Sequence, residues 1–301
     1  IFDPEVLVRN MAELGFSEQD EARWHAISGK PHGIILVTGP TGSGKTTTLY
    51  STLKQLATPE VNVCTIEDPI EMVEPAFNQM QVHQAIDLGF AEGVRALMRQ
   101  DPDIIMVGEI RDLQTAEMAI QAALTGHLVL STLHTNSAAE SVIRLLDLGM
   151  DPMNFGDSLI GIVAQRLVRA LCKHCAVPKV LTGAELEALA QEYMEGTSLK
   201  MEEASQRLLE AAALASGDRE APVRMYHPVG CERCGGRGYK GRMGIYELLE
   251  NTGGMKQKIQ SRAATSDIFQ EATRAGMRTL RQDAIEKVLA GYIDLAQSRL
   301  V

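Results

Sequence analysis

The segment Gly39-Pro-Thr-Gly-Ser-Gly-Lys45-Thr46 decides the fold, because it matches the pattern G-x-x-x-x-G-K-[ST] at every fixed position. Glycines let backbone N–H groups turn inward and hold phosphate oxygens, and a helix that follows adds the positive end of its dipole. Apolar residues 34–38 predict a strand before the loop, and residues 46–57 predict a helix after it. We therefore expect a phosphate-binding loop between a strand and a helix.

The loop also assigns roles to single residues. The lysine of such a loop reaches the β- and γ-phosphates and the next hydroxyl binds Mg²⁺, roles that fall to Lys45 and Thr46. The expected nucleotide contacts are Gly39, Pro40, Thr41, Gly42, Ser43, Gly44, Lys45, Thr46 and Thr47. The loop alone does not separate ATPases, GTPases and kinases. The chain has no N-K-x-D segment of the kind that reads guanine, which disfavours a GTPase.

Predicted strands and helices alternate after the loop. The patterns of residues 61–66, 104–107 and 128–132 indicate strands, and those of 90–98 and 113–124 indicate helices. This alternation predicts an α/β fold with a mostly parallel sheet and helices on both faces. Together with the loop, it indicates a RecA-like P-loop NTPase core.

Two carboxylates follow predicted strands and are candidates for the group that orients or deprotonates the attacking water. Glu67 lies in Thr65-Ile-Glu-Asp-Pro-Ile-Glu71, and Glu109 ends Ile104-Ile-Met-Val-Gly-Glu109. Ligands of such sheets bind at the carboxyl ends of the strands. The pattern leaves open which of the two is the base. Because Gly108 stands where many P-loop enzymes carry a metal-linked Asp, we expect Mg²⁺ to depend more on Thr46 and water.

Beyond about residue 150 the pattern becomes helical, and a helical C-terminal region is expected after the core. Residues 159–171 are expected to form a strong helix, 185–213 and 266–289 further helices, and 216–222 a polar linker. The spacing of Val6, Leu7, Met11 and Leu14 predicts a helix that Gly15 ends. The expected divisions are a helical lead-in at 1–30, an ATPase core at 31–150, a zinc-binding subdomain with a helical insertion at 151–240, and a helical region at 241–301.

Four of the five cysteines form two Cys-x-x-Cys pairs, Cys172/Cys175 and Cys231/Cys234. Each pair holds two thiolates on one turn, and four thiolates complete a tetrahedral zinc site. No secretory signal precedes them, which favours zinc over disulfides. The alternative is two unrelated, redox-active pairs. Cys64 lies in a predicted buried strand and is interpreted as a small core residue.

Composition excludes some classes of protein. The formal net charge of −10 argues against a coat for duplex nucleic acid, which needs an excess of Lys and Arg. No apolar run approaches the roughly 20 residues of a membrane span, and no signal peptide is evident, so we expect a cytoplasmic chain. Because Ile1 is not a natural initiator, we also expect the 301 residues to be part of a longer protein.

Several motifs occur in a fixed order, at residues 39–50, 67–71, 107–112 and 125–136. In these segments the sequence resembles the secretion ATPases of bacterial type II secretion and type IV pilus assembly. Residues 165–169 and 238–247 also resemble segments of that family. The resemblance extends from about residue 11 to the end of the chain.

The resemblance implies roles for these segments. Residues 39–46 correspond to the Walker A loop of the family, 67–71 to its "Asp box", 104–109 to its Walker B element and 125–136 to its "His box". Glu109 would be the catalytic glutamate. Each histidine of the His box lies beside one end of a predicted strand, and His134 shares the sheet edge of the phosphates. His134 is therefore a catalytic candidate and His127 a nucleotide contact, with a histidine satisfied by the backbone as the alternative for either.

The resemblance also implies an assembly. Members form hexamers in which arginines complete the charge stabilisation of phosphoryl transfer near a subunit boundary. Arg242 and Arg166 match family positions, Arg242 better, and a salt bridge is the alternative for Arg166. Family members carry an upstream domain that supplies further arginines, and the resemblance leads us to expect that this chain begins after it. Members that retract pili lack the four cysteines, so these favour assembly or secretion.

The expected function is ATP hydrolysis, with ATP, Mg²⁺ and Zn²⁺ as cofactors. The work would reach an inner-membrane platform protein that assembles a type IV pilus or a type II secretion pseudopilus. The chain would be peripheral at that membrane through its partners. One alternative is a DNA-uptake motor or another P-loop motor on nucleic acid, which the acidic charge disfavours. The other is a non-catalytic nucleotide-binding scaffold.

Overall fold

A computed structural model describes residues 9–301, so Val6 and Leu7 of the expected lead-in helix lie outside the described residues. The described chain divides into two compact units, each built from two separate stretches of sequence. Unit 1 contains residues 9–165 and Leu248–Met277, and unit 2 contains Arg166–Glu247 and Arg278–Val301. The units therefore interleave along the chain and do not follow the four ranges expected from the sequence.

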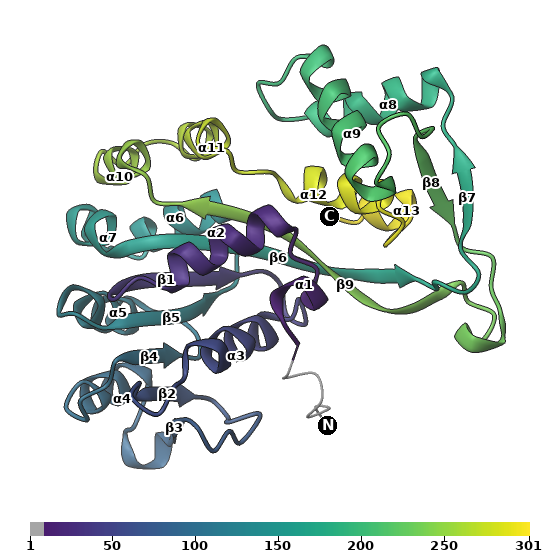
Figure 1. Cartoon of the computed structure of the whole chain (residues 1–301). Helices are drawn as coiled ribbons and strands as arrows, with labels where there is room; N and C mark the ends of the chain where they lie inside the picture. Colours follow the sequence, from purple (N-terminus) through teal and green to yellow (C-terminus); the bar gives the residue numbers. More distant parts are fainter. Residues whose placement is uncertain (1–8) are drawn as a thin grey trace. The chain divides into compact units, whose positions relative to one another are not determined.

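A seven-stranded sheet with the order β3-β2-β4-β5-β1-β6-β9 organises unit 1 (Figure 1). Its strands are β1 Gly33–Thr38, β2 Val63–Glu67, β3 Asn78–Gln81, β4 Ile104–Val107, β5 Leu128–Leu133, β6 Leu159–Leu171 and β9 Tyr239–Glu250. Every pairing from β3 through β6 is parallel. The last strands, β6 and β9, continue past the limit of unit 1 into the sequence of unit 2.

Strand β5 lies between β1, which precedes the phosphate loop, and β4, which precedes Glu109. In register, Thr38 of β1 pairs with Leu133 of β5, and Ser131 of β5 pairs with Val107 of β4. Because all three strands are parallel, the residues that follow them meet at one edge of the sheet. This arrangement confirms the mostly parallel α/β core.

Two groups of helices cover the sheet of unit 1 (Figure 1). The first group is α1 Met11–Leu14, α2 Glu18–Ser28 and α3 Lys45–Leu56. The second is α4 Phe90–Leu97, α5 Leu113–Leu124, α6 Ala138–Asp147, α7 Pro152–Ser158, α10 Gly253–Gln260 and α11 Thr265–Arg274; a short 3₁₀ helix, η2, spans Gln84–Ile86. The second group shares one apolar core with the central strands. In the first group, Trp24 is fully buried and its indole N–H donates to Thr52 at 3.0 Å.

Unit 2 has its own small sheet and core. Strands β7 Val177–Val180 and β8 Arg224–His227 pair antiparallel. Its helices are α8 Gly183–Met194, α9 Met201–Ser216, η3 Glu232–Cys234, α12 Leu280–Leu289 and α13 Leu295–Ser298. Tyr193 of α8, Leu208 of α9 and Leu289 of α12 share one buried cluster. The helices between the cysteine pairs thus pack on a C-terminal helix, which explains why residues from 278 onward belong to unit 2.

The predicted helix at residues 159–171 was wrong, because these residues form strand β6. The apolar spacing fits a helix, but the first seven residues of the strand are all buried. A strand covered on both faces is apolar without alternation, so its pattern does not distinguish it from a buried helix. Ile160, Ile162 and Val163 are β-branched, a side-chain type that favours strands.

The expectation of helix from residue 241 onward fails for residues 241–250, which belong to β9. Gly241 and Gly244 interrupt the strand pattern there and hide it from the sequence. The expected strands at 34–38, 61–66, 104–107 and 128–132 are present, with ends shifted by at most two residues. None of the helices within residues 9–301 combines the length and apolar character that a membrane crossing requires.

Candidate nucleotide site and cysteine cluster

The phosphate loop connects β1 directly to α3. Its glycines Gly39, Gly42 and Gly44 have positive φ angles of 148°, 78° and 89°. Such angles strain any residue with a Cβ atom. At Gly39 the space is closed as well, because a Cβ there would lie 2.4 Å from the backbone oxygen of Gln165. Both the conformation and the packing of the loop therefore require glycine at its start.

Lys45 folds back over this loop. Its side chain is buried, and Nζ donates to the carbonyl oxygens of Gly39 at 2.8 Å and Pro40 at 3.1 Å. Thr46 and Thr47 follow in the first turn of α3 and are partly buried. The first N–H groups of a helix have no partner within the helix and attract anions. The loop, the ammonium group and the helix start therefore provide the donors that an anion-binding site requires.

Glu109 and His134 meet at the same edge of the sheet. The Oε2 atom of Glu109 lies 3.4 Å from Nε2 of His134, and its Oε1 atom lies 2.5 Å from a guanidinium nitrogen of Arg111. The Glu109 side chain is 12% exposed, His134 is 47% exposed and Arg111 is 69% exposed. The carboxylate is therefore held by two cationic or polar groups on its solvent side.

The backbone beside His134 is tied to the start of the phosphate loop. The N–H of Thr135 donates to Oγ1 of Thr38 at 3.0 Å, and the two hydroxyl groups lie 2.7 Å apart. Thr38 is the last residue of β1 and Gly39 begins the loop. These bonds fix the segment that carries His134 relative to the loop.

Glu67 has a different environment. It is 4% exposed; its Oε2 accepts from the Tyr50 hydroxyl at 2.7 Å, and its Oε1 accepts from Thr65 at 2.6 Å and Gln79 at 3.3 Å. Burial and the bond to Glu67 raise the pKa of Tyr50, so the phenol stays a donor. Neutral donors from α3, β2 and β3 thus enclose this carboxylate, whereas Glu109 reaches the edge of the site.

The structure does not bring His127, another predicted residue, to this edge. His127 precedes β5 and donates from Nδ1 to the carbonyl of Ala122 at 2.9 Å. A strand of six residues, about 20 Å at roughly 3.3 Å per residue, separates it from His134. Arg242 is exposed on β9 and Arg166 is partly buried on β6, and both belong to unit 2 rather than to the unit that holds the loop.

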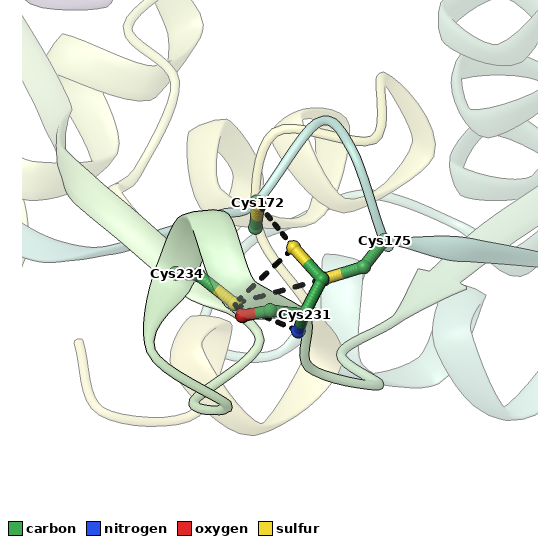
Figure 2. A group of neighbouring side chains, drawn as sticks. All are labelled: Cys172, Cys175, Cys231 and Cys234. Carbon is green, nitrogen blue, oxygen red and sulfur yellow. Dashed lines mark hydrogen bonds between the residues drawn. The ribbon is translucent and has the colours of Figure 1, made fainter.

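The four paired cysteines converge in unit 2 (Figure 2). Cys172 follows β6 and Cys175 precedes β7, while Cys231 directly precedes the short helix η3 and Cys234 is its last residue. The sulfur atoms lie within 4.8 Å of one another, with separations of 3.9 Å for Cys172–Cys231, 3.8 Å for Cys175–Cys234 and 3.8 Å for Cys231–Cys234. A tetrahedron with Zn–S bonds of about 2.3 Å places its sulfur atoms about 3.8 Å apart. The cluster therefore fits a tetrahedral metal ion.

Backbone amides support the second pair. The N–H groups of Cys231 and Gly238 each donate to Sγ of Cys234 at 3.2 Å. These bonds favour the thiolate and lower the pKa of Cys234 to about 6. His174 lies between the first two cysteines in sequence, but its ring contacts the Arg233 guanidinium at 3.0 Å and it is not in the cluster. All five cysteines are free thiols, including the buried Cys64.

Fold and loop together define a P-loop nucleotide-binding protein. Residues 1–299 match the family model described as type II/IV secretion system protein, and the chain belongs to this family. It is 54% identical over 297 residues to the type IV pilus assembly ATPase TfpB of Acinetobacter baylyi, covering 99% of this chain and 47% of that protein. It is 44% identical to the type II secretion system protein E of Pseudomonas aeruginosa, covering 94% of this chain and 51% of that one.

A third relative, the type IV pilus assembly ATPase PilB of Thermus thermophilus, is 44% identical. The match covers 96% of this chain and 30% of that protein. The chain thus spans about half or less of these relatives. Among solved structures, the crystal structure of the pilus retraction motor PilT with bound ADP superposes with a TM-score of 0.65 at 27% identity, covering 97% of this chain and 66% of that one. The ATPase DotB of Legionella pneumophila shares the fold, with a TM-score of 0.63 at 23% identity over 97% of this chain and 64% of that one.

Proposed function

We propose that this chain binds Mg-ATP at residues 39–47 and hydrolyses it, as the motor part of a pilus-assembly or type II secretion ATPase. The observation that carries the proposal is the pair Glu109 and His134 at the sheet edge of a complete phosphate loop. The names of the relatives, ATPases of type IV pilus assembly and a type II secretion protein, support the same function.

The roles follow from the contacts. Lys45 leaves the carbonyls of Gly39 and Pro40 to meet the β- and γ-phosphates, and Thr46 supplies the hydroxyl for Mg²⁺. Glu109 orients and deprotonates the attacking water, because its carboxylate reaches the open edge of the site. His134 donates to the γ-phosphate. Glu67 is enclosed by neutral donors and positions α3 instead of acting as the base.

Charge stabilisation is completed across a subunit boundary. We place Arg242, the better match to the family, and Arg166 beside the nucleotide of a neighbouring subunit in a homo-hexamer, as the resemblance to the secretion ATPases implies; both residues lie in unit 2. His127, which is bonded to its own backbone, reaches a nucleotide only in the same way. Arginines that approach phosphate from a second subunit stabilise the charge of the transition state.

The cysteine cluster holds a structural Zn²⁺ through Cys172, Cys175, Cys231 and Cys234. The sulfur separations support a closed four-thiolate site, which is the structural rather than the catalytic type. When bound, the metal would tie the turn after β6 to the turn before β9 and so stabilise unit 2.

The work of hydrolysis passes to an inner-membrane platform protein, and the motor is cytoplasmic and peripheral at that membrane through this partner. We expect no direct contact with nucleic acid, because the net charge is −10.

Binding titrations test the proposal. Mg-ADP is expected to bind the wild-type chain, and Lys45→Ala is expected to weaken binding by about 100-fold, since the ammonium contacts the phosphates. A duplex oligonucleotide provides the comparison. Tight binding to it that weakens steeply with salt would favour a nucleic-acid motor instead.

A further inference from the structure

Gln165 is a buried polar residue in the otherwise apolar first half of β6. It is 1% exposed and follows Ala164, which pairs with Thr38 at the end of β1. This register places Gln165 beside the first residue of the phosphate loop. Burying an amide costs free energy unless its polar atoms form hydrogen bonds. The hydrogen-bond partners of Gln165 therefore indicate its structural role.

The side chain and the backbone of Gln165 both contact parts of the phosphate site. The side-chain Nε2 donates to the carbonyl oxygen of Ser43 at 2.7 Å, and Oε1 accepts from Oγ1 of Thr48 at 2.9 Å. The backbone oxygen of Gln165 closes the space over Gly39. One residue therefore contacts the start of the loop, the end of the loop and the helix that follows.

The bond to Ser43 sets the direction of a backbone donor. The peptide unit is planar and trans, so the carbonyl of Ser43 and the N–H of Gly44 point in opposite directions. Because the carbonyl points to Gln165, the N–H of Gly44 points away from β6. Backbone N–H groups of this part of the loop are those that hold phosphate oxygens.

We infer that Gln165 is a positioning residue of the phosphate site, which holds the Ser43–Gly44 peptide so that the Gly44 N–H faces the phosphate. The inference rests on the proposed nucleotide binding and adds a residue outside the loop to it. Loss of the amide lets this peptide rotate, so that binding of the phosphates is weakened while binding of the base is not.

Two variants separate the contacts. Gln165→Met keeps the length of the side chain and removes both bonds, and Gln165→Glu keeps an acceptor for Thr48 but places a carboxylate against the Ser43 carbonyl. The matched control is Gln282→Met. Gln282 is 2% exposed in α12, donates to the carbonyl of Tyr193 at 3.1 Å and accepts from the N–H of Thr279 at 3.0 Å, so it is a buried amide of the same kind in unit 2.

The probes are Mg-ADP and Mg-pyrophosphate, measured by calorimetry or by displacement of a fluorescent nucleotide. Both Gln165 variants are expected to bind both probes about tenfold more weakly, by the same factor, and Gln282→Met is expected to stay within about twofold of wild type. Fluorescence of Trp24, the only tryptophan, reports whether unit 1 is folded in each variant.

Wild-type affinity of Gln165→Met for both probes would overturn the inference, and so would a loss for Mg-ADP without a loss for pyrophosphate. If the Gln165 variants do not fold, Thr48→Val provides a second test, because it removes the hydroxyl that donates to Oε1 of Gln165. This variant is expected to bind both probes about threefold more weakly, and Thr48→Ser is expected to restore the wild-type affinity. Equal affinities for wild type, Thr48→Val and Thr48→Ser would also overturn it. A wild-type chain that binds neither probe would instead contradict the proposed function itself.

Discussion

The Nε2 atom of His134 lies 3.4 Å from the Oε2 atom of Glu109, although the two residues follow different strands, β5 and β4. Parallel pairing of these strands sets the contact, because Val107 is in register with Ser131 and both strands end within two residues of that pair. A further bond from Thr135 to Thr38 connects the histidine segment to the phosphate loop. These contacts therefore connect His134, Glu109 and the start of the phosphate loop.

His134→Ala is expected to slow ATP hydrolysis by about 100-fold, because it removes a donor that acts on the transferred phosphoryl group. The affinity for Mg-ADP, which has no γ-phosphate, should change by less than about threefold. Steady-state hydrolysis and an ADP titration measure the two effects. The exposed His83 offers the control His83→Ala, which is expected to leave both unchanged. An equal loss of ADP affinity in His134→Ala would contradict the assigned role.

Tyr50→Phe removes a donor from the buried Glu67 carboxylate. We expect the free energy of unfolding to fall by about 1–3 kcal/mol, the cost of leaving such a group with one donor fewer. Denaturant unfolding followed by Trp24 fluorescence measures the change. Tyr292, whose side chain lies on the surface, gives the control Tyr292→Phe, for which no change beyond about 0.5 kcal/mol is expected.

The same hydroxyl predicts a dependence on alkaline pH. Burial and Glu67 raise the pKa of Tyr50 in the folded state above the ordinary value of about 10. Above pH 10 the unfolded chain loses this proton while the folded chain keeps it, so the unfolded state binds fewer protons and stability falls as pH rises. Wild type should therefore lose stability more steeply above pH 10 than Tyr50→Phe. Parallel curves for the two proteins would contradict this.

Cys231→Ser is expected to lower the zinc content of a reduced preparation from about one ion per chain to a small fraction of that, because three thiolates remain. Unit 2 should then unfold at lower denaturant concentration, as followed by circular dichroism. Cys64→Ser is the control, since Cys64 lies outside the cluster and burial raises its pKa. Zinc content that is the same in wild type and Cys231→Ser would count against the four-thiolate site.

Functional residues that belong to local sequence motifs could be predicted from the sequence. The glycines and Lys45 of the loop, the position of Glu109 after an apolar strand, and the two cysteine pairs all depend on neighbours within a few residues. The structure brings the four cysteines together although about 55 residues separate the pairs. This long-range contact was predictable because a tetrahedral thiolate site requires four cysteines, which two Cys-x-x-Cys pairs supply.

Contacts that depend on strand pairing could not be predicted from local motifs. The wrong helix at residues 159–171 concealed that Gln165 lies beside Gly39. A glutamine within an apolar run was the available signal, but its partners could not be identified without knowing that β6 pairs with β1. The hydrogen bonds from Tyr50 and Gln79 to Glu67 could not be predicted for the same reason, because they connect helix α3 and strand β3 to strand β2.

Hydrolysis of radiolabelled ATP by Glu109→Gln, under single-turnover conditions, tests the central claim most directly. We expect the variant to bind ATP within about threefold of the wild-type affinity and to hydrolyse it at least about 100-fold more slowly, because the amide cannot accept the proton of the attacking water. Glu117→Gln, on the exposed face of α5, should behave as wild type. Hydrolysis by Glu109→Gln at the wild-type rate would contradict the account.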